Sequence, residues 1–134
     1  MKAEEIRKAV RDRYGDIAAK SGTCCLPGAA CCGGESLVGN ISLGVGYRPE
    51  DLQVVPEGAN LGLGCGNPVA LASLRAGETV VDLGAGAGFD CFLAAREVGA
   101  TGWVIGVDMT SAMVDKARAN ARKGGYGNVE FRLG

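Results

Sequence analysis

The sequence contains no histidine, and only seven of its 134 residues are aromatic: three Phe, three Tyr and one Trp. Any catalytic or metal-binding site must therefore be built without imidazole. The aromatic residues form no series on which nucleic-acid bases could stack. Basic and acidic residues nearly balance, at 14 and 15, and the formal net charge of -1 gives little attraction to nucleic acids or anionic membranes. The composition therefore disfavours a nucleic-acid-binding role.

The sequence also lacks a long apolar run. No stretch approaches the roughly 18 to 20 apolar residues that span a bilayer. The N-terminal segment "MKAEEIRKAVRDRYGDIAAK" is charged from its second residue, unlike a signal peptide. We therefore expect a cytoplasmic protein, in which thiols stay mostly reduced. Six cysteines in such a chain favour metal, metalloid or redox chemistry over structural disulfides.

Glycine, by contrast, is abundant, with 23 residues. The share lies well above the average of about 7% in proteins. The glycines follow no fixed period, which excludes collagen-like and repeat folds. They predict loops in which the backbone turns sharply or approaches a ligand closely. The length of 134 residues allows at most one domain.

Four of the cysteines lie in the stretch "TCCLPGAACCGGE", where Cys24 adjoins Cys25 and Cys31 adjoins Cys32. A disulfide staple, a zinc site and a site for a softer thiophilic element are the three candidate explanations. Four thiolates can hold zinc, but the usual zinc pattern has two separated C-x-x-C pairs, which adjacent cysteines match poorly. A redox role also stays open. Cys91, which lies in a predicted helix, is expected to be a small buried apolar residue.

The N-terminal part of the chain is predicted to be a helix followed by a long irregular region. Ile6, Val10 and Ile17 recur at helical spacing and predict an amphipathic helix that packs on a core. Residues 21–66 show no period and contain five of the six cysteines. We expect this region to be a functional loop, interrupted by a short helix at "RPEDLQ" with its proline in the first helical position.

Strand and helix patterns alternate after this region. The predicted helices are "GNPVALASLRAG", "FDCFLAAREVG" and "TSAMVDKARANARKGG", and the predicted strands are "ETVVDLG", "GWVIGVD" and "NVEFRLG", the first two of them buried. This order predicts an α/β fold with the first half of a doubly wound, Rossmann-like parallel sheet and right-handed crossovers. We divide the chain into residues 1–66, the helix and cysteine-rich segment, and residues 67–134, the partial Rossmann-like domain.

The first predicted strand should be central in such a sheet, yet the sequence offers no strand for its outer side. The long cysteine-rich region is one candidate to cover that edge. Otherwise we expect this chain to be the N-terminal part of a larger domain, or to form a dimer through the exposed sheet edge.

The stretch "VVDLGAGAGFDCF" places a glycine-rich turn between the first predicted strand and its helix. Such a turn lets a ligand approach bare backbone amides at a helix N-terminus. The glycines follow G-x-G-x-G from Gly84 to Gly88, in place of the G-x-G-x-x-G of dinucleotide sites, and Asp82 precedes them. Asp108 ends the second strand in "VIGVDM", where a carboxylate can accept hydrogen bonds from both hydroxyls of a ribose.

This pattern resembles motif I of the class I S-adenosylmethionine methyltransferases. The resemblance implies that the cofactor is S-adenosylmethionine, with its methionine part on the glycine turn and its cationic groups near Asp82. It further implies that Asp108 binds the ribose and that Met109 packs on the adenine. The cofactor-binding residues predicted in this way are Asp82, Gly84, Ala85, Gly86, Gly88, Asp108 and Met109.

A longer segment, "SLGVGYRPEDLQVVPEGANLGLGCGNPVALASLRAGETVVDLGAGAGFDCFLAA", resembles the arsenite S-adenosylmethionine methyltransferases of bacteria and archaea. The segments "SGTCCLPGAACCGG" and "VIGVDMTSAMVDKARANARKGGYGNVEFRLG" resemble the same family. In that family thiolates hold arsenic(III), which implies Cys65 of "GLGCGNP" together with Cys24 or Cys25. Cys31 and Cys32 resemble a second pair found in microbial members. Two further cysteines of the family have positions beyond the last residue of this sequence.

The resemblance implies that the chain transfers a methyl group from S-adenosylmethionine to thiolate-bound arsenic(III). Arsenic(III) is soft and selects thiolates, and its lone pair needs no general base. A thiol reductant, thioredoxin or glutathione, is implied for turnover, and the substrate is a small molecule. Two alternatives stay open. One is a non-catalytic fragment that binds a metalloid or zinc, and the other is a methyltransferase for a small organic molecule with zinc in the cysteine loop.

Overall fold

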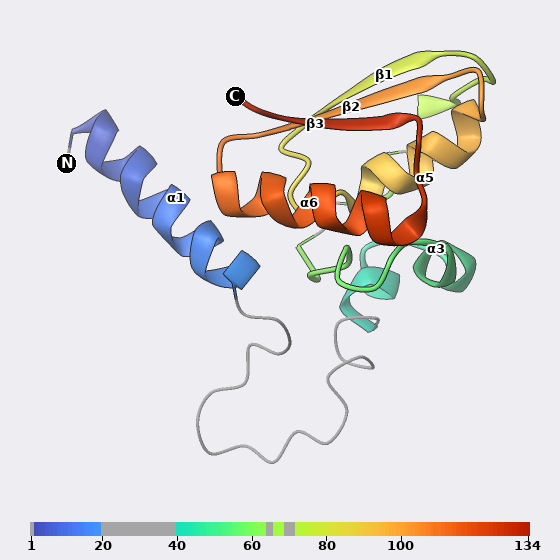
Figure 1. Cartoon of the computed structure of the whole chain (residues 1–134). Coiled ribbons are helices and arrows are strands. Elements are labelled where there is room, and N and C mark those ends of the chain that lie inside the picture. The colour runs from blue at the N-terminus through green and yellow to red at the C-terminus, as the bar shows by residue number, and fades with distance from the viewer. Residues whose placement is uncertain (1, 20–39, 64–65, 69–71) are drawn as a thin grey trace.

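A computed structural model describes residues 2–19, 40–63, 66–68 and 72–134 of the chain. Its elements are α1 (Ala3–Ala19), α3 (Pro49–Val54), β1 (Thr79–Leu83), α5 (Phe89–Val98), β2 (Trp103–Asp108), α6 (Ser111–Gly124) and β3 (Val129–Leu133) (Figure 1). Within these ranges, every helix is too short or too polar to cross a membrane. The strands, α5, α6 and the short helix at "RPEDLQ" confirm the sequence predictions. The predicted helix at "GNPVALASLRAG" falls partly outside the described residues.

The three strands form one parallel sheet in the order β1-β2-β3. Two successive crossovers in the same direction place both α5 and α6 on one face of this sheet (Figure 1). The predicted α/β half-sheet is therefore confirmed. Because the strands are parallel, the carboxyl ends of β1 and β2 lie at the same end of the sheet, and so do the loops that follow them.

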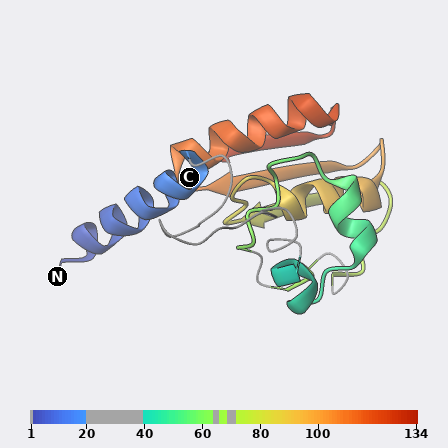
Figure 2. The same cartoon turned by 90° about the horizontal axis from the view of Figure 1, so that it is seen from below.

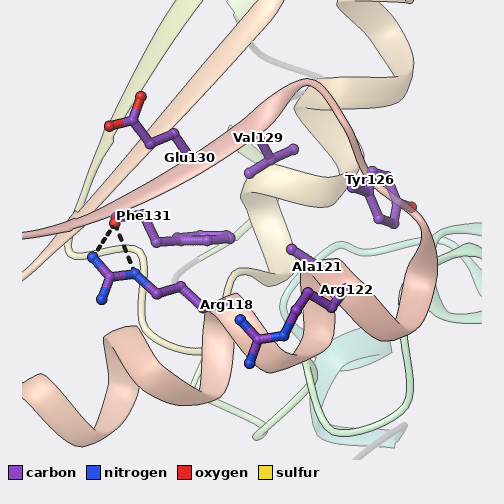
Figure 3. A pocket seen from close by; sticks show the side chains of 7 residues that line it. All are labelled: Arg118, Ala121, Arg122, Tyr126, Val129, Glu130 and Phe131. Atoms are coloured by element: carbon purple, nitrogen blue, oxygen red, sulfur yellow. Dashed lines mark hydrogen bonds between the residues drawn. The ribbon is translucent and has the colours of Figure 1, made fainter.

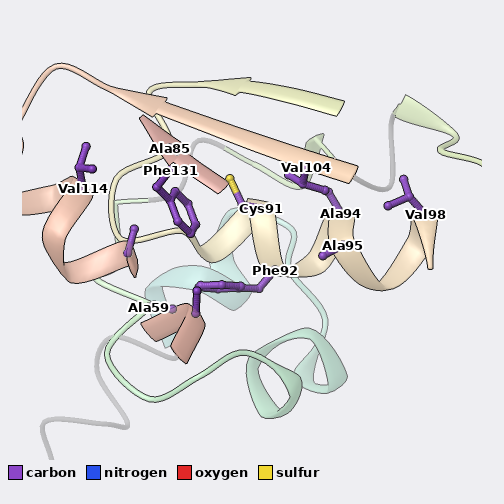
Figure 4. Close-up of a cluster of buried hydrophobic side chains, with 12 residues drawn as sticks. Ala59, Ala85, Cys91, Phe92, Ala94, Ala95, Val98, Val104, Val114 and Phe131 are labelled. Atoms are coloured by element: carbon purple, nitrogen blue, oxygen red, sulfur yellow. The ribbon is translucent and has the colours of Figure 1, made fainter. Parts of the chain in front are cut away.

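The core lies between the sheet and the two helices (Figure 4). Phe92 of α5 is fully buried, and its ring centroid lies 5.8 Å from that of Phe131 and 4.6 Å from that of Tyr126. Gly106 of β2 makes room for this contact, because a Cβ there would lie 2.6 Å from Phe131 Cδ1. The aromatic rings thus tie β2 and β3 to α5.

The prediction that the first strand is buried is wrong. Val81 is 57% exposed and Leu83 is 79% exposed. Side chains alternate along a strand, so these two point away from the face that α5 and α6 cover. Trp103, at the start of β2, is paired with Thr79 and is itself 40% exposed. No described helix packs on this second face of the sheet, which leaves its apolar side chains accessible.

The prediction that α1 is a helix is confirmed, and its predicted packing through an apolar stripe is confirmed in part, since Val10 and Ile17 are half-buried. Ile6 is 46% exposed, and the only buried residue of α1 is Ala18. Among the described elements α1 packs chiefly on α6, where Lys116 Nζ donates to the Ala18 carbonyl at 3.2 Å. Figures 1 and 2 show α1 at one side of the molecule, away from the main core. The helical period therefore predicts the conformation of α1 correctly, and its burial only toward the C-terminal end.

Candidate functional site

The glycine turn between β1 and α5 has a backbone that side chains rarely adopt. Gly84 has φ +83° and Gly86 has φ +54°. A Cβ at either position would meet no other atom within 4 Å, so packing does not require glycine there. Both glycines line a cavity instead, where their missing side chains leave space for a ligand beside the backbone.

Asp108 fixes the shape of this turn from the end of β2. Its Oδ2 accepts a hydrogen bond from the Gly86 N–H at 2.9 Å, and its Oδ1 accepts one from the Thr110 N–H at 2.8 Å. Each carboxylate oxygen keeps capacity for a further donor. Asn120 of α6 holds the other side of the turn, because its Nδ2 donates to the Ala87 carbonyl at 3.1 Å. The turn is therefore held before any ligand binds.

The cavity over this turn has a volume of about 360 Å³. Such a volume lies in the range of roughly 300 to 1,000 Å³ that small-molecule sites occupy. Its walls come from α1, the segment before residue 64, the glycine turn, α5, the end of β2 and α6. The lining residues are Val10, Tyr14, Ala59, Asn60, Leu61, Leu63, Gly84, Ala85, Gly86, Ala87, Phe89, Asp90, Asp108, Met109, Thr110 and Met113.

The cavity wall fits S-adenosylmethionine on three points. Asp108 offers a fixed carboxylate for the ribose hydroxyls. Met109, 46% exposed, and the buried Met113 offer apolar surface for the adenine. Thr110 is 5% exposed, and its Oγ1 has no hydrogen-bond partner among the described residues. Because buried hydroxyls are normally hydrogen-bonded, this oxygen is available to a ligand or a water molecule.

Two predicted cofactor residues lie outside this lining. Asp82 Oδ2 accepts a hydrogen bond from Cys91 Sγ at 3.3 Å, beneath the turn. Gly88 is buried against aromatic rings, and a Cβ there would lie 2.7 Å from Phe131 Cζ. The predicted cofactor contacts of these two residues stay predictions, whereas Gly84, Ala85, Gly86, Asp108 and Met109 come together in the wall of one cavity.

Cys91 is fully buried, as the sequence predicted. Burial, and next the charge of Asp82, raise the pKa of its thiol far above the ordinary value. Because the thiolate is the reactive species, we expect alkylation of Cys91 by iodoacetamide in the native chain to be slower by at least about 100-fold than in urea. Peptide mass mapping after timed alkylation measures both rates. Equal rates in the two conditions would contradict the buried position.

Asp90 is a functional candidate that the sequence patterns did not reveal. It lines the cavity from the first turn of α5. The Tyr47 hydroxyl donates to both of its carboxylate oxygens, at 2.8 and 3.0 Å. Burial raises the pKa of Asp90 to about 6; the Tyr47 hydrogen bond opposes this rise, and the charge of Asp82 adds to it. No local pattern marks it, because Tyr47, which orients its carboxylate, lies 43 residues away in the sequence.

The cysteines predicted to bind arsenic or zinc lie outside the described residues: Cys24, Cys25, Cys31, Cys32 and Cys65. Within the part of the chain that the structure covers, no three His, Cys, Asp or Glu side chains gather as metal ligands. Leu63, two residues before the last of these cysteines, lines the cavity. The segment that leads to "GCG" therefore borders the candidate cofactor site.

A second cavity of about 330 Å³ lies between the C-terminal half of α6 and β3 (Figure 3). Two of its charged side chains, Arg118 and Glu130, are already engaged. Arg118 Nε and Nη2 donate to the Phe131 carbonyl at 3.2 and 2.9 Å, and Glu130 pairs with Arg132 at 2.6 Å. None of the glycine-turn residues lines it. We therefore assign the candidate site to the first cavity.

Comparison with known proteins agrees with this geometry. A family model described as a methyltransferase domain matches residues 74–134. An arsenite methyltransferase of Halobacterium salinarum is 52% identical over 98% of this chain and 35% of that protein. An arsenite methyltransferase of Aquipseudomonas alcaligenes is 35% identical over 96% of this chain and 36% of that protein. An arsenite methyltransferase of Mus musculus is 34% identical over 87% of this chain and 28% of that protein. The chain thus spans about a third of the length of the curated relatives that it matches.

Proposed function

Because this chain belongs to the class I S-adenosylmethionine-dependent methyltransferases, we propose that it binds this cofactor and takes part in methyl transfer to arsenite. The observation that carries the cofactor assignment is the glycine turn held by Asp108 over a cavity in which the Thr110 hydroxyl has no partner among the described residues. The arsenite assignment is supported by 52% identity over 98% of the chain to an arsenite methyltransferase.

The chain's own residues have separate tasks in this proposal. The Asp108 carboxylate accepts hydrogen bonds from the ribose, and the turn at Gly84 and Gly86 gives the methionine part room beside the backbone. Met109 and Met113 cover the adenine. When bound, S-adenosylmethionine supplies an electrophilic methyl group on a sulfonium sulfur. The apolar lining around it excludes water, so that a hydroxide does not compete for that methyl group.

The substrate part of the site is expected to consist of cysteine thiolates, and arsenic(III) suits such ligands because soft centres select thiolates. We propose that Cys65, with Cys24 or Cys25, holds arsenic(III), and that Cys31 and Cys32 are further candidate ligands. The support for Cys65 is its position two residues after Leu63 of the cavity wall. Zinc at the same loop is the competing occupant, and a titration separates the two.

The step needs positioning rather than acid–base catalysis. The arsenic lone pair forms the As–C bond while the S–C bond breaks, and the electron pair of that bond stays on sulfur. No proton moves, which agrees with a sequence that contains no histidine. The lone pair is consumed, so a second round requires two electrons from a thiol reductant such as thioredoxin or glutathione. Holding the reactants in line supplies most of the rate enhancement in such a step.

The test is an anaerobic titration of the reduced chain with arsenite, followed by thiol–arsenic absorbance. We expect saturation near about one arsenic per chain in the wild type, with affinity reduced at least about tenfold by Cys65→Ser, since one thiolate ligand is lost. Cys91→Ser is the matched control, because its side chain is buried beneath the glycine turn and should leave the titration unchanged.

Transfer itself is measured with methyl-labelled S-adenosylmethionine and a thiol reductant. Label that appears on arsenic supports the full proposal. Arsenite binding without transfer would leave a binding role for this chain and overturn its part in catalysis. A titration that does not respond to Cys65→Ser would overturn the arsenic site.

A further inference from the structure

Asp90 is a second carboxylate in the cavity wall, and the function proposed above gives it no task. Tyr47 Oη donates to both of its oxygens, so that one hydroxyl fixes the plane of the carboxylate. Tyr47 is itself only 3% exposed, and its ring packs edge-on against Phe89 with centroids 4.7 Å apart. The neighbouring elements therefore set the orientation of Asp90 before any ligand enters.

The ionisable groups around Asp90 include carboxylates but no cation among the described residues. In the part of the chain that the structure describes, the groups that act on its ionisation are the Tyr47 hydroxyl and the Asp82 carboxylate, and neither is a cation. The other titratable groups that line the cavity are Tyr14 of α1 and Asp108. A half-buried carboxylate in such a place is costly to ionise until a positive partner reaches it. The cavity is therefore suited to a cationic ligand.

The cofactor of the proposed function carries such a charge at its methionine end, on the sulfonium and on the ammonium group. Building on that function, we propose that Asp90 is a cofactor-binding residue whose carboxylate, oriented by Tyr47, receives the positively charged methionine end of S-adenosylmethionine. Asp108 then binds the ribose at one side of the cavity, and Asp90 binds the amino-acid part at the other. Tyr47 is a positioning residue, because it acts through Asp90.

This arrangement couples cofactor binding to pH. The pKa of Asp90 lies at about 6 without a ligand, mainly because of burial. A cationic ligand favours the ionised carboxylate and lowers that pKa. Well above pH 6 the carboxylate is already ionised before the cofactor binds, so Asp90 adds no further pH dependence to the affinity. Below that pH a proton must leave Asp90 when the cofactor binds, so the affinity falls by up to about tenfold for each pH unit.

The test is titration calorimetry of the whole chain with S-adenosylmethionine between about pH 5 and pH 8, a range that brackets the ionisation of Asp90. We expect the wild-type affinity to fall on the acid side. Asp90→Asn should bind weakly at every pH, near the wild-type level at the acid end, and should lose the slope. Tyr47→Phe removes a hydrogen bond that stabilises the ionised form, so its affinity should begin to fall at a higher pH.

Methylthioadenosine is the matched ligand, because it keeps the adenosine but lacks the charged amino-acid end. Its affinity should not depend on Asp90 or on pH in this range. The proposal is overturned if Asp90→Asn keeps the wild-type affinity and slope, or if it weakens methylthioadenosine equally. A purely structural role for Tyr47 would lower affinity without moving the pH profile, which would also contradict the proposal.

The proposal can also be tested on the wild-type protein alone, which matters if Asp90→Asn does not fold. Calorimetry at about pH 6 in two buffers of different ionisation enthalpy should show release of about half a proton on cofactor binding, and no release on binding of methylthioadenosine. No proton release with either ligand would overturn the proposal. Failure of the proposed function itself looks different, since then the wild type binds neither ligand at any pH.

Discussion

Replacing Asp108 by asparagine should weaken S-adenosylmethionine binding on the order of 100-fold or more, since two hydrogen bonds to a charged acceptor, each worth about 1.5 to 3 kcal/mol, are lost or weakened. The carboxylate also accepts from the Gly86 and Thr110 N–H groups. An asparagine amide turns an NH₂ group toward one of these donors, so the glycine turn loses its support together with the ribose partner. Titration calorimetry with the purified chain measures the change in affinity.

Asp115→Asn is the matched control for this loss of charge. Asp115 lies on the exposed surface of α6, where its carboxylate is 3.9 Å from Arg118 Nη1 and both side chains are open to solvent. Exposed pairs of this kind contribute about 0 to 1 kcal/mol, so its cofactor affinity should stay near the wild-type value. Less than a tenfold loss for Asp108→Asn, with an unchanged circular dichroism spectrum, would contradict the role assigned to Asp108.

The sequence predicted the local structure of residues 79–133 well because several signals agreed there. Short runs rich in Val and Ile alternated with helical periods, and Gly99 ends α5 with a positive φ of +68°. Burial was predicted less well because it depends on which faces other elements cover. β1 has the composition of a buried strand, yet both crossover helices lie on one face, and Leu83 faces away from them.

The same distinction applies to the site. Asp108 could be predicted because it occupies a recognisable place, the end of the strand after a glycine turn. Asp90 could not, because its partner Tyr47 lies 43 residues away in a region without periodic pattern. Only the packing of that region on α5 brings the two side chains together. The acid that the sequence favoured for the cofactor's cationic groups, Asp82, contacts Cys91 beneath the turn.

Gly88→Ala should lower the free energy of unfolding by about 2 to 5 kcal/mol, from forced close contacts and from a left-handed conformation that costs a side chain about 1 to 2 kcal/mol. Gly88 has φ +96°, and its Cβ would lie 2.7 Å from Phe131 Cζ and 2.8 Å from Phe92 Cε2. Phe92 is fully buried and Phe131 is 4% exposed, so neither ring has free space to retreat into. A loss of this size is a large share of the roughly 5 to 15 kcal/mol that stabilises an ordinary domain.

Gly125→Ala separates the two contributions. Gly125, which ends α6, is also left-handed, with φ +70° and ψ +26°, but a Cβ there would meet nothing within 4 Å, so this variant carries the backbone cost alone, about 1 to 2 kcal/mol. Urea denaturation followed by far-ultraviolet circular dichroism measures both variants against the wild type. If Gly88→Ala lowers the free energy of unfolding no more than Gly125→Ala does, the glycine turn is not packed tightly against the aromatic core. A clear excess would show that Gly88 supports the site through packing, since Phe89 and Asp90 follow it directly into the cavity wall.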